Sequence, residues 1–149
     1  MTREGIYART VTLIGLLLAI LFTYTAANKL IHLDLFQLRL GRMPYLAPFA
    51  IWISWLIPFL ELVIAGLLLF EKYRRMALWG SLLLLGVFTI YIAVVLNFSD
   101  SIPCTCGGVI SALGWKDHML FNGAFMLLTL LGLLWSRKRT TFIEHQNTT

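Results

Sequence analysis

Long apolar runs separated by short polar segments dominate the chain. Four runs are long enough to cross a bilayer core of about 30 Å, which takes about 20 helical residues at about 1.5 Å each. We place these spans at about residues 11–27, 47–70, 76–97 and 118–135. The only acidic or basic residues in them are Glu61, inside the second, and His118, at the start of the fourth. The pattern predicts an all-α membrane protein with a four-transmembrane-helix bundle.

The segments between and after the spans contain more polar residues. The first loop contains LIHLDLFQLRLGRMP, in which apolar residues alternate imperfectly with polar ones. This pattern favours a short interfacial helix in the lipid headgroups, ended by Gly41 and Pro44. We expect residues 1–139 to form the transmembrane domain and residues 140–149 a polar cytoplasmic tail.

The distribution of basic residues predicts the orientation. Lys and Arg residues concentrate on the cytoplasmic side of short loops. With the N-terminus inside, eight of the 12 Lys and Arg residues fall in the termini and the 71–75 turn. The other four fall in the outer loops, residues 28–44 and 98–117. We therefore predict both termini inside, in a multi-pass protein of the bacterial inner membrane.

Composition supports a lipid environment. Hydrophobic residues make up 59% of the 149 residues and charged residues only 13%, whereas soluble domains carry about a quarter charged residues. The net charge of +5 could suggest nucleic-acid binding in a soluble protein. Here the basic residues end apolar runs, so we expect a lipid bilayer as partner and no nucleic acid.

Both cysteines lie in the second outer loop, in the sequence Cys104-Thr105-Cys106-Gly107-Gly108. An outward-facing loop lies in an oxidising compartment, where disulfides persist. A bond across one intervening residue is strained and easily reduced, and the glycines let a partner approach closely. We favour thiol–disulfide exchange by this pair. A static clip, which would remove little chain entropy, and binding of copper(I) by the two thiolates remain alternatives.

The start of the fourth span offers side chains that could assist the cysteines. His118 and Asn122 are four residues apart and share one helix face. His118 could stabilise a thiolate or carry a proton during exchange. Trp115 and Asn122 are supporting candidates beside it. The alternative is a helix-end histidine that contacts only headgroups and water.

Glu61 is the second candidate for function, because an ionisable group within a span is expensive to bury. Pro58 precedes it and removes a backbone donor, so this region could form a polar pocket for a proton or a quinone headgroup. Lys29 is the obvious charge partner. Glu61, however, lies 14 residues after Ala47, about 21 Å below the outer edge, and Lys29 stands at that edge. Pairing requires a deeper first helix and stays open, as does a purely structural, protonated Glu61.

Several of these elements together carry a family resemblance. Lys29, Pro58 and Glu61, with the run CTCGG…W…H…FN from Cys104 to Asn122, resemble the DoxX-like and methylamine-utilisation (MauE) family of redox-associated membrane proteins. The resemblance covers roughly residues 11–135. It implies a four-helix bundle that helps to form disulfides in an exported partner such as a dehydrogenase subunit.

The functional prediction is thiol–disulfide exchange with an exported thiol-containing protein or a subunit of a membrane complex. The electrons would leave to a quinone or to another protein, and the lack of a second cysteine pair favours another protein. No cofactor or metal follows with certainty from the sequence. The alternatives are a non-enzymatic accessory subunit with a structural disulfide, a copper-handling protein, and ion or solute transport through Glu61.

Overall fold

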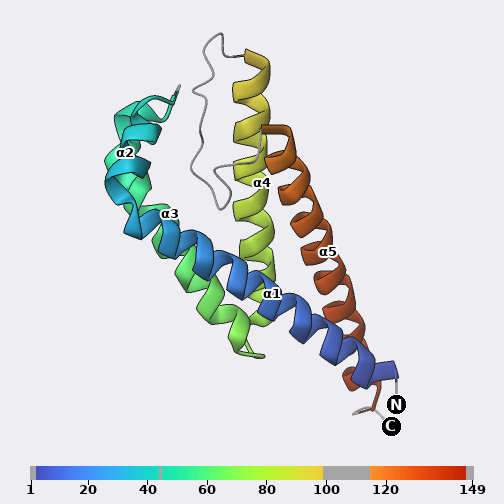
Figure 1. The fold of residues 1–149 in the computed structure, drawn as a ribbon. Helices are drawn as coiled ribbons and strands as arrows, with labels where there is room; N and C mark the ends of the chain where they lie inside the picture. The colour runs from blue at the N-terminus through green and yellow to red at the C-terminus, as the bar shows by residue number, and fades with distance from the viewer. Residues whose placement is uncertain (1–2, 44, 99–114, 147–149) are drawn as a thin grey trace.

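The computed structural model describes residues 3–43, 45–98 and 115–146. Within these ranges the chain is helical apart from short turns, and no described residue lies in a β-strand. The helices are α1 (Arg3–Ile31), α2 (Leu33–Gly41), α3 (Ala50–Leu69), α4 (Arg74–Phe98) and α5 (Trp115–Gln146), with a 3-10 turn at Ala47–Phe49 before α3 (Figure 1). The predicted all-α bundle is confirmed.

Four helices are long and apolar enough to cross a membrane. These spans are Gly5–Ile31, Ala47–Leu69, Arg74–Val94 and Asp117–Ser136. Helix α1 extends beyond the predicted first span, residues 11–27, at both ends, because helix hydrogen bonding continues through polar residues that hydropathy excludes. For the same reason α5 continues to Gln146, through most of the expected polar tail.

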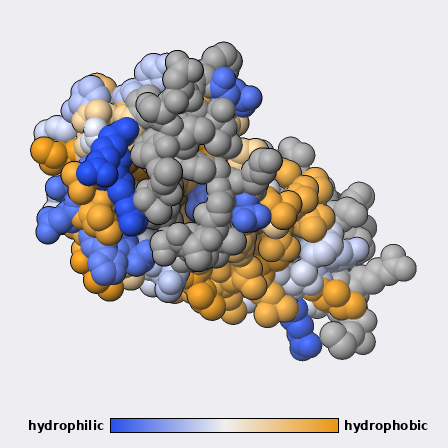
Figure 2. All heavy atoms as spheres, turned by 45° about the horizontal axis from the view of Figure 1, so that its top comes forward, coloured by the Kyte–Doolittle hydropathy of each residue, from blue (hydrophilic) through white to orange (hydrophobic). Residues whose placement is uncertain are grey.

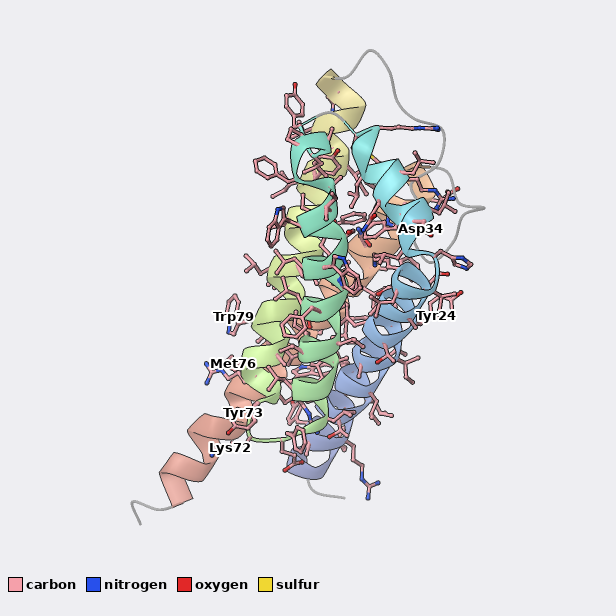
Figure 3. The ribbon with its side chains drawn as sticks, turned by 90° about the vertical axis from the view of Figure 1, so that its left-hand side faces the viewer. Tyr24, Asp34, Lys72, Tyr73, Met76 and Trp79 are labelled. Carbon is pink, nitrogen blue, oxygen red and sulfur yellow. The ribbon has the colours of Figure 1, made fainter. Side chains whose placement is uncertain are left out.

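The helices form a bundle in which α1 packs against α3 and α5, and α4 packs against α3 and α5. Both termini lie at one end (Figure 1), as an even number of spans requires. The predicted short helix in the first loop is confirmed as α2, which lies at the other end. There Gln37 Nε2 donates to Ser54 Oγ of α3 at 3.1 Å. Asp34 on α2 and Lys72 in the α3–α4 turn lie toward opposite ends of the bundle (Figure 3).

The exterior of the bundle is strongly apolar. The buried stripe of α1 comprises Val11, Ile14, Leu18, Phe22 and Ala26, spaced three or four residues apart as one helix face requires. The residues between them, such as Leu13 and Ile20, are apolar yet exposed. Figure 2 shows hydrophobic side chains over much of the visible flank, with hydrophilic ones gathered mainly toward the end that carries α2. Hydrocarbon is the environment that suits such a surface.

Arg74, the first residue of α4, ties the turn end of the bundle together. Its side chain is buried, its Nε donates to the Leu68 carbonyl oxygen at 3.2 Å, and its Nη1 donates to Thr12 Oγ1 at 3.0 Å. Leu68 belongs to the last turn of α3, whose carbonyl oxygens lack helical partners. The guanidinium therefore caps α3 and joins it to α1.

Replacing Arg74 by Met should lower the free energy of unfolding by about 2–3 kcal/mol, because hydrogen bonds from a charged group are lost and the Leu68 carbonyl is left unsatisfied. Arg75 is the matched control, since it is the next residue and is exposed. Arg75→Met should change stability by no more than about 0.5 kcal/mol. The measurement is unfolding in mixed lipid–detergent micelles. Equal effects of the two substitutions would contradict this role for Arg74.

Candidate functional site

The structure brings Lys29 and Glu61 into direct contact. Lys29 Nζ lies 2.7 Å from Glu61 Oε1 and 3.0 Å from Oε2, and it also approaches the Thr25 carbonyl oxygen at 3.5 Å. The two side chains are only 11% and 8% exposed. A buried carboxylate and a buried ammonium each need such a partner to retain charge. The pair therefore joins α1 to α3 inside the bundle.

The sequence left this pairing open because it placed Lys29 at the outer edge of the membrane. In the structure α1 continues past Lys29 to Ile31 and α2 follows directly, so the end of the apolar run does not mark the edge. Lys29 also continues the buried stripe of α1, three residues after Ala26 and seven after Phe22. That spacing was the sequence signal for its inward orientation.

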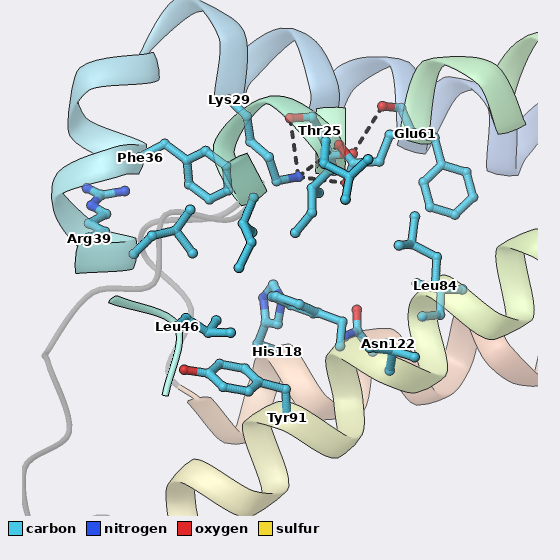
Figure 4. Close-up of a pocket in the computed structure, with 18 of the residues that line it drawn as sticks. Thr25, Lys29, Phe36, Arg39, Leu46, Glu61, Leu84, Tyr91, His118 and Asn122 are labelled. Atoms are coloured by element: carbon cyan, nitrogen blue, oxygen red, sulfur yellow. Dashed lines mark hydrogen bonds and ion pairs between the residues drawn. The ribbon is translucent and has the colours of Figure 1, made fainter. Parts of the chain in front are cut away.

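A cavity of about 320 Å³ lies beside this ion pair. All five helices contribute to its wall, which is mainly aliphatic and aromatic. Its polar lining residues are Thr25, Lys29, Arg39, Glu61, Tyr91, His118 and Asn122. Figure 4 shows the Lys29–Glu61 pair on one side of the cavity, with His118 and Asn122 on the other. Sequence reasoning did not include Thr25, Arg39 or Tyr91, because their shared position depends on how the helices pack.

His118 and Asn122 face this cavity together, as their spacing predicted. The His118 ring stands edge-on to Phe88 of α4, with ring centroids 5.4 Å apart. Asn122 is buried, at 4% exposure. Its Nδ2 has no hydrogen-bond partner among the described residues, and such a buried donor costs about 1–3 kcal/mol. His118 thus contacts an aromatic side chain of α4 and shares the cavity wall with Asn122.

The cysteine pair falls outside the described residues. Cys104, Cys106, Gly107 and Gly108 belong to residues 99–114, which the structure does not describe. Trp115 begins α5, and its side chain is likewise outside the description. The two helix ends that this segment joins, at Phe98 and Trp115, lie away from the chain termini, toward the end that carries α2 (Figure 1).

Comparison with known proteins agrees with the fold and with the predicted resemblance. The sequence model of one family, described as methylamine utilisation protein MauE, matches residues 7–135. Neither a curated protein nor a solved structure gave a match. The matched segment covers most of the chain and overlaps all four apolar spans. The chain is therefore a multi-pass membrane protein that belongs to the MauE family.

Proposed function

We propose that this protein performs thiol–disulfide exchange at the outer face of the bacterial inner membrane, with Cys104 and Cys106 as the reacting pair. The partner is an exported or membrane-bound protein that carries thiols. One observation carries the proposal: the segment with both cysteines leads directly into α5, whose first turns present His118 and Asn122 to a cavity that also contains the Lys29–Glu61 pair. The reactive pair and the polar cavity are thus close in the chain.

The exchange proceeds in two displacements. A partner thiolate attacks one sulfur of the Cys104–Cys106 disulfide, so that a mixed disulfide forms and the other cysteine leaves as a thiolate. A second partner thiolate attacks the mixed disulfide and releases the first cysteine. The partner's two thiols become a disulfide, and the pair becomes a dithiol that holds two electrons. Neutral His118 accepts the proton of the attacking thiol and returns it to the leaving thiolate.

Family membership supports this reading without defining the substrate. The family description names methylamine utilisation, a process that the present sequence does not itself indicate. A partner with several thiols that is exported before it folds would need an oxidant at the outer face of the membrane. A redox-active pair in an outward loop suits that need.

A trapping experiment tests the proposal. Cys106→Ser and Cys104→Ser variants, each with one reactive cysteine, are expressed at native level, and membranes are quenched with alkylating reagent. At least one variant should accumulate a reductant-sensitive adduct, and mass spectrometry of the adduct names the partner. The Cys104→Ser, Cys106→Ser double variant is the control and should form none. Absence of any adduct, with a wild-type pair that stays oxidised in mild reductant, would favour an accessory subunit with a structural disulfide.

A further inference from the structure

We infer that the cavity between α1, α3, α4 and α5 binds the headgroup of a membrane-dissolved quinone, and that this quinone accepts the electrons from the cysteine pair. The source of the electrons rests on the proposed function. The binding site is argued from the described residues of the structure alone. The sequence favoured another protein as acceptor, with a quinone as the alternative; the cavity lined by Glu61 now favours the quinone.

The size and lining of the cavity fit a single apolar ring. Ligand sites are commonly about 300–1,000 Å³, mostly apolar, with a few placed polar groups. This cavity, at about 320 Å³, is at the small end of that range. Aromatic side chains, among them Phe36, Phe88 and Phe121, line it beside the polar groups. A quinone headgroup is such a ring, with its polarity confined to two carbonyl oxygens.

The hydrogen-bonding groups match a ligand that only accepts. Quinone carbonyl oxygens accept hydrogen bonds and cannot donate them. Asn122 lines the cavity with a buried Nδ2 that lacks a partner among the described residues. The last torsion of an Asn side chain is broad, so a half-turn of the carboxamide directs Nδ2 at a bound carbonyl. A ligand acceptor would thereby satisfy a donor that has no partner among the described residues.

The Lys29–Glu61 pair favours a neutral ligand beside it, and Arg39, which also lines the cavity, can donate a hydrogen bond to a carbonyl oxygen. The ammonium of Lys29 and the carboxylate of Glu61 are in contact at 2.7 Å, so they compensate one another. An anionic ligand would compete with Glu61 for Lys29, and a cation would compete with Lys29 for Glu61. A neutral quinone leaves the pair intact.

Two residues of the cavity wall also reach the lipid-facing surface. Leu56 of α3 and Val87 of α4 both line it, and both are more than half exposed, at 54% and 59%. They lie within membrane spans, so their exposed faces meet hydrocarbon. A quinone can therefore enter sideways from the bilayer with its isoprenoid tail left between the lipids.

The electron transfer balances without another reactant. Two cysteine thiols and one quinone give one disulfide and one quinol, so the pair loses two electrons and the quinone oxygens gain two protons. His118 faces the cavity near the start of α5 and is placed to pass the thiol protons toward the quinone. The oxidised pair is then ready for the next partner.

Photolabelling tests the site. Full-length protein in lipid nanodiscs is illuminated with a short-chain azido-benzoquinone, with and without excess decyl-benzoquinone. Competed labels should map to cavity residues of α1, α4 and α5. Leu84→Trp, which fills the cavity wall, should abolish competed labelling, whereas Leu83→Trp, on the neighbouring lipid-facing position, should preserve it. Labels that are spread over lipid-facing residues, or that are unaffected by Leu84→Trp, would overturn the inference.

Asn122→Leu supplies a second test that does not depend on filling the cavity. Loss of one hydrogen bond should raise the quinone concentration for half-maximal labelling about three- to tenfold. The ligand-free variant should unfold at the same or a higher temperature, since an unpaired buried donor is removed. A marked fall in that temperature would assign the amide a structural role and contradict the argument from Asn122.

The Cys104→Ser, Cys106→Ser variant separates the two proposals. It should still show competed labelling of the cavity, because the described residues that line it are unchanged in this variant. In wild-type protein, reduced cysteines should reoxidise anaerobically when decyl-benzoquinone is added, and Leu84→Trp should abolish that reaction. Site-specific labelling with no thiol reaction at all would refute the thiol–disulfide proposal and retain the quinone site. Thiol exchange without site-specific labelling would refute the quinone site and retain the thiol–disulfide proposal.

Discussion

Lys29→Met and Glu61→Leu should each lower the free energy of unfolding by about 3–5 kcal/mol, and the double variant should recover most of that loss. Each single substitution leaves one ionisable group buried without its partner, which is the costly arrangement for an internal ion pair. Removing both leaves no ionisable group at this contact between α1 and α3, where the pair now joins them at 2.7 Å. The loss of unfolding free energy should thus be large when one partner is replaced and small when both are replaced.

A double-mutant cycle measures this coupling directly. The four proteins are unfolded with increasing denaturing detergent in lipid micelles, and the coupling free energy is the double effect minus the two single effects. Tyr24→Phe, on an exposed face of α1 one residue before Thr25, controls for nonspecific change to the helix. Additive single effects would contradict a stabilising contact between Lys29 and Glu61.

Replacing both cysteines by serine should abolish thiol exchange while changing the free energy of unfolding by less than about 1 kcal/mol. A disulfide stabilises mainly by restricting the unfolded chain, and the effect grows with the length of the loop that it closes. A bond across one residue restricts the unfolded chain very little. The activity, in contrast, requires both sulfurs. The two outcomes together distinguish a reactive pair from a structural clip.

The measurement uses inverted and right-side-out membrane vesicles supplied with a reduced dithiol peptide, whose oxidation is followed by mass spectrometry. Ser101→Ala and Ser111→Ala, in the same loop, are the control variants and should retain wild-type rates. If the double cysteine variant unfolds far more easily yet still supports peptide oxidation, the pair has a structural role and does not perform the exchange.

Much of the fold follows from the sequence because lipid imposes a simple rule on it. A chain segment in hydrocarbon must satisfy its own backbone hydrogen bonds, so each long apolar run must be a helix. The interfacial helix α2 was likewise readable from its alternating Leu residues and from Gly41. The helix ends were less predictable, since residues such as Arg9 and Asn28 continue a helix that hydropathy would end.

The site was only partly readable, because packing decides which residues meet. The spacing of His118 and Asn122 correctly predicted one shared face. Lys29 and Glu61 were identified singly, but their contact depends on the relative depth of α1 and α3, which no local pattern fixes. Arg39 reaches the cavity only because α2 folds back over the bundle end. The cavity itself is a product of five helices and has no sequence signature.

The side of the membrane on which the cysteines lie is the claim that the functional account needs most. Intact spheroplasts, first treated with a permeant reductant, are exposed to a membrane-impermeant maleimide. Cys104 and Cys106 should be labelled at once. A Lys72→Cys substitution in the Cys104→Ser, Cys106→Ser background, in the α3–α4 turn toward the end away from Asp34 of α2 (Figure 3), should be labelled only after the bilayer is broken. The reverse pattern would put the cysteines in the cytoplasm and refute the redox role.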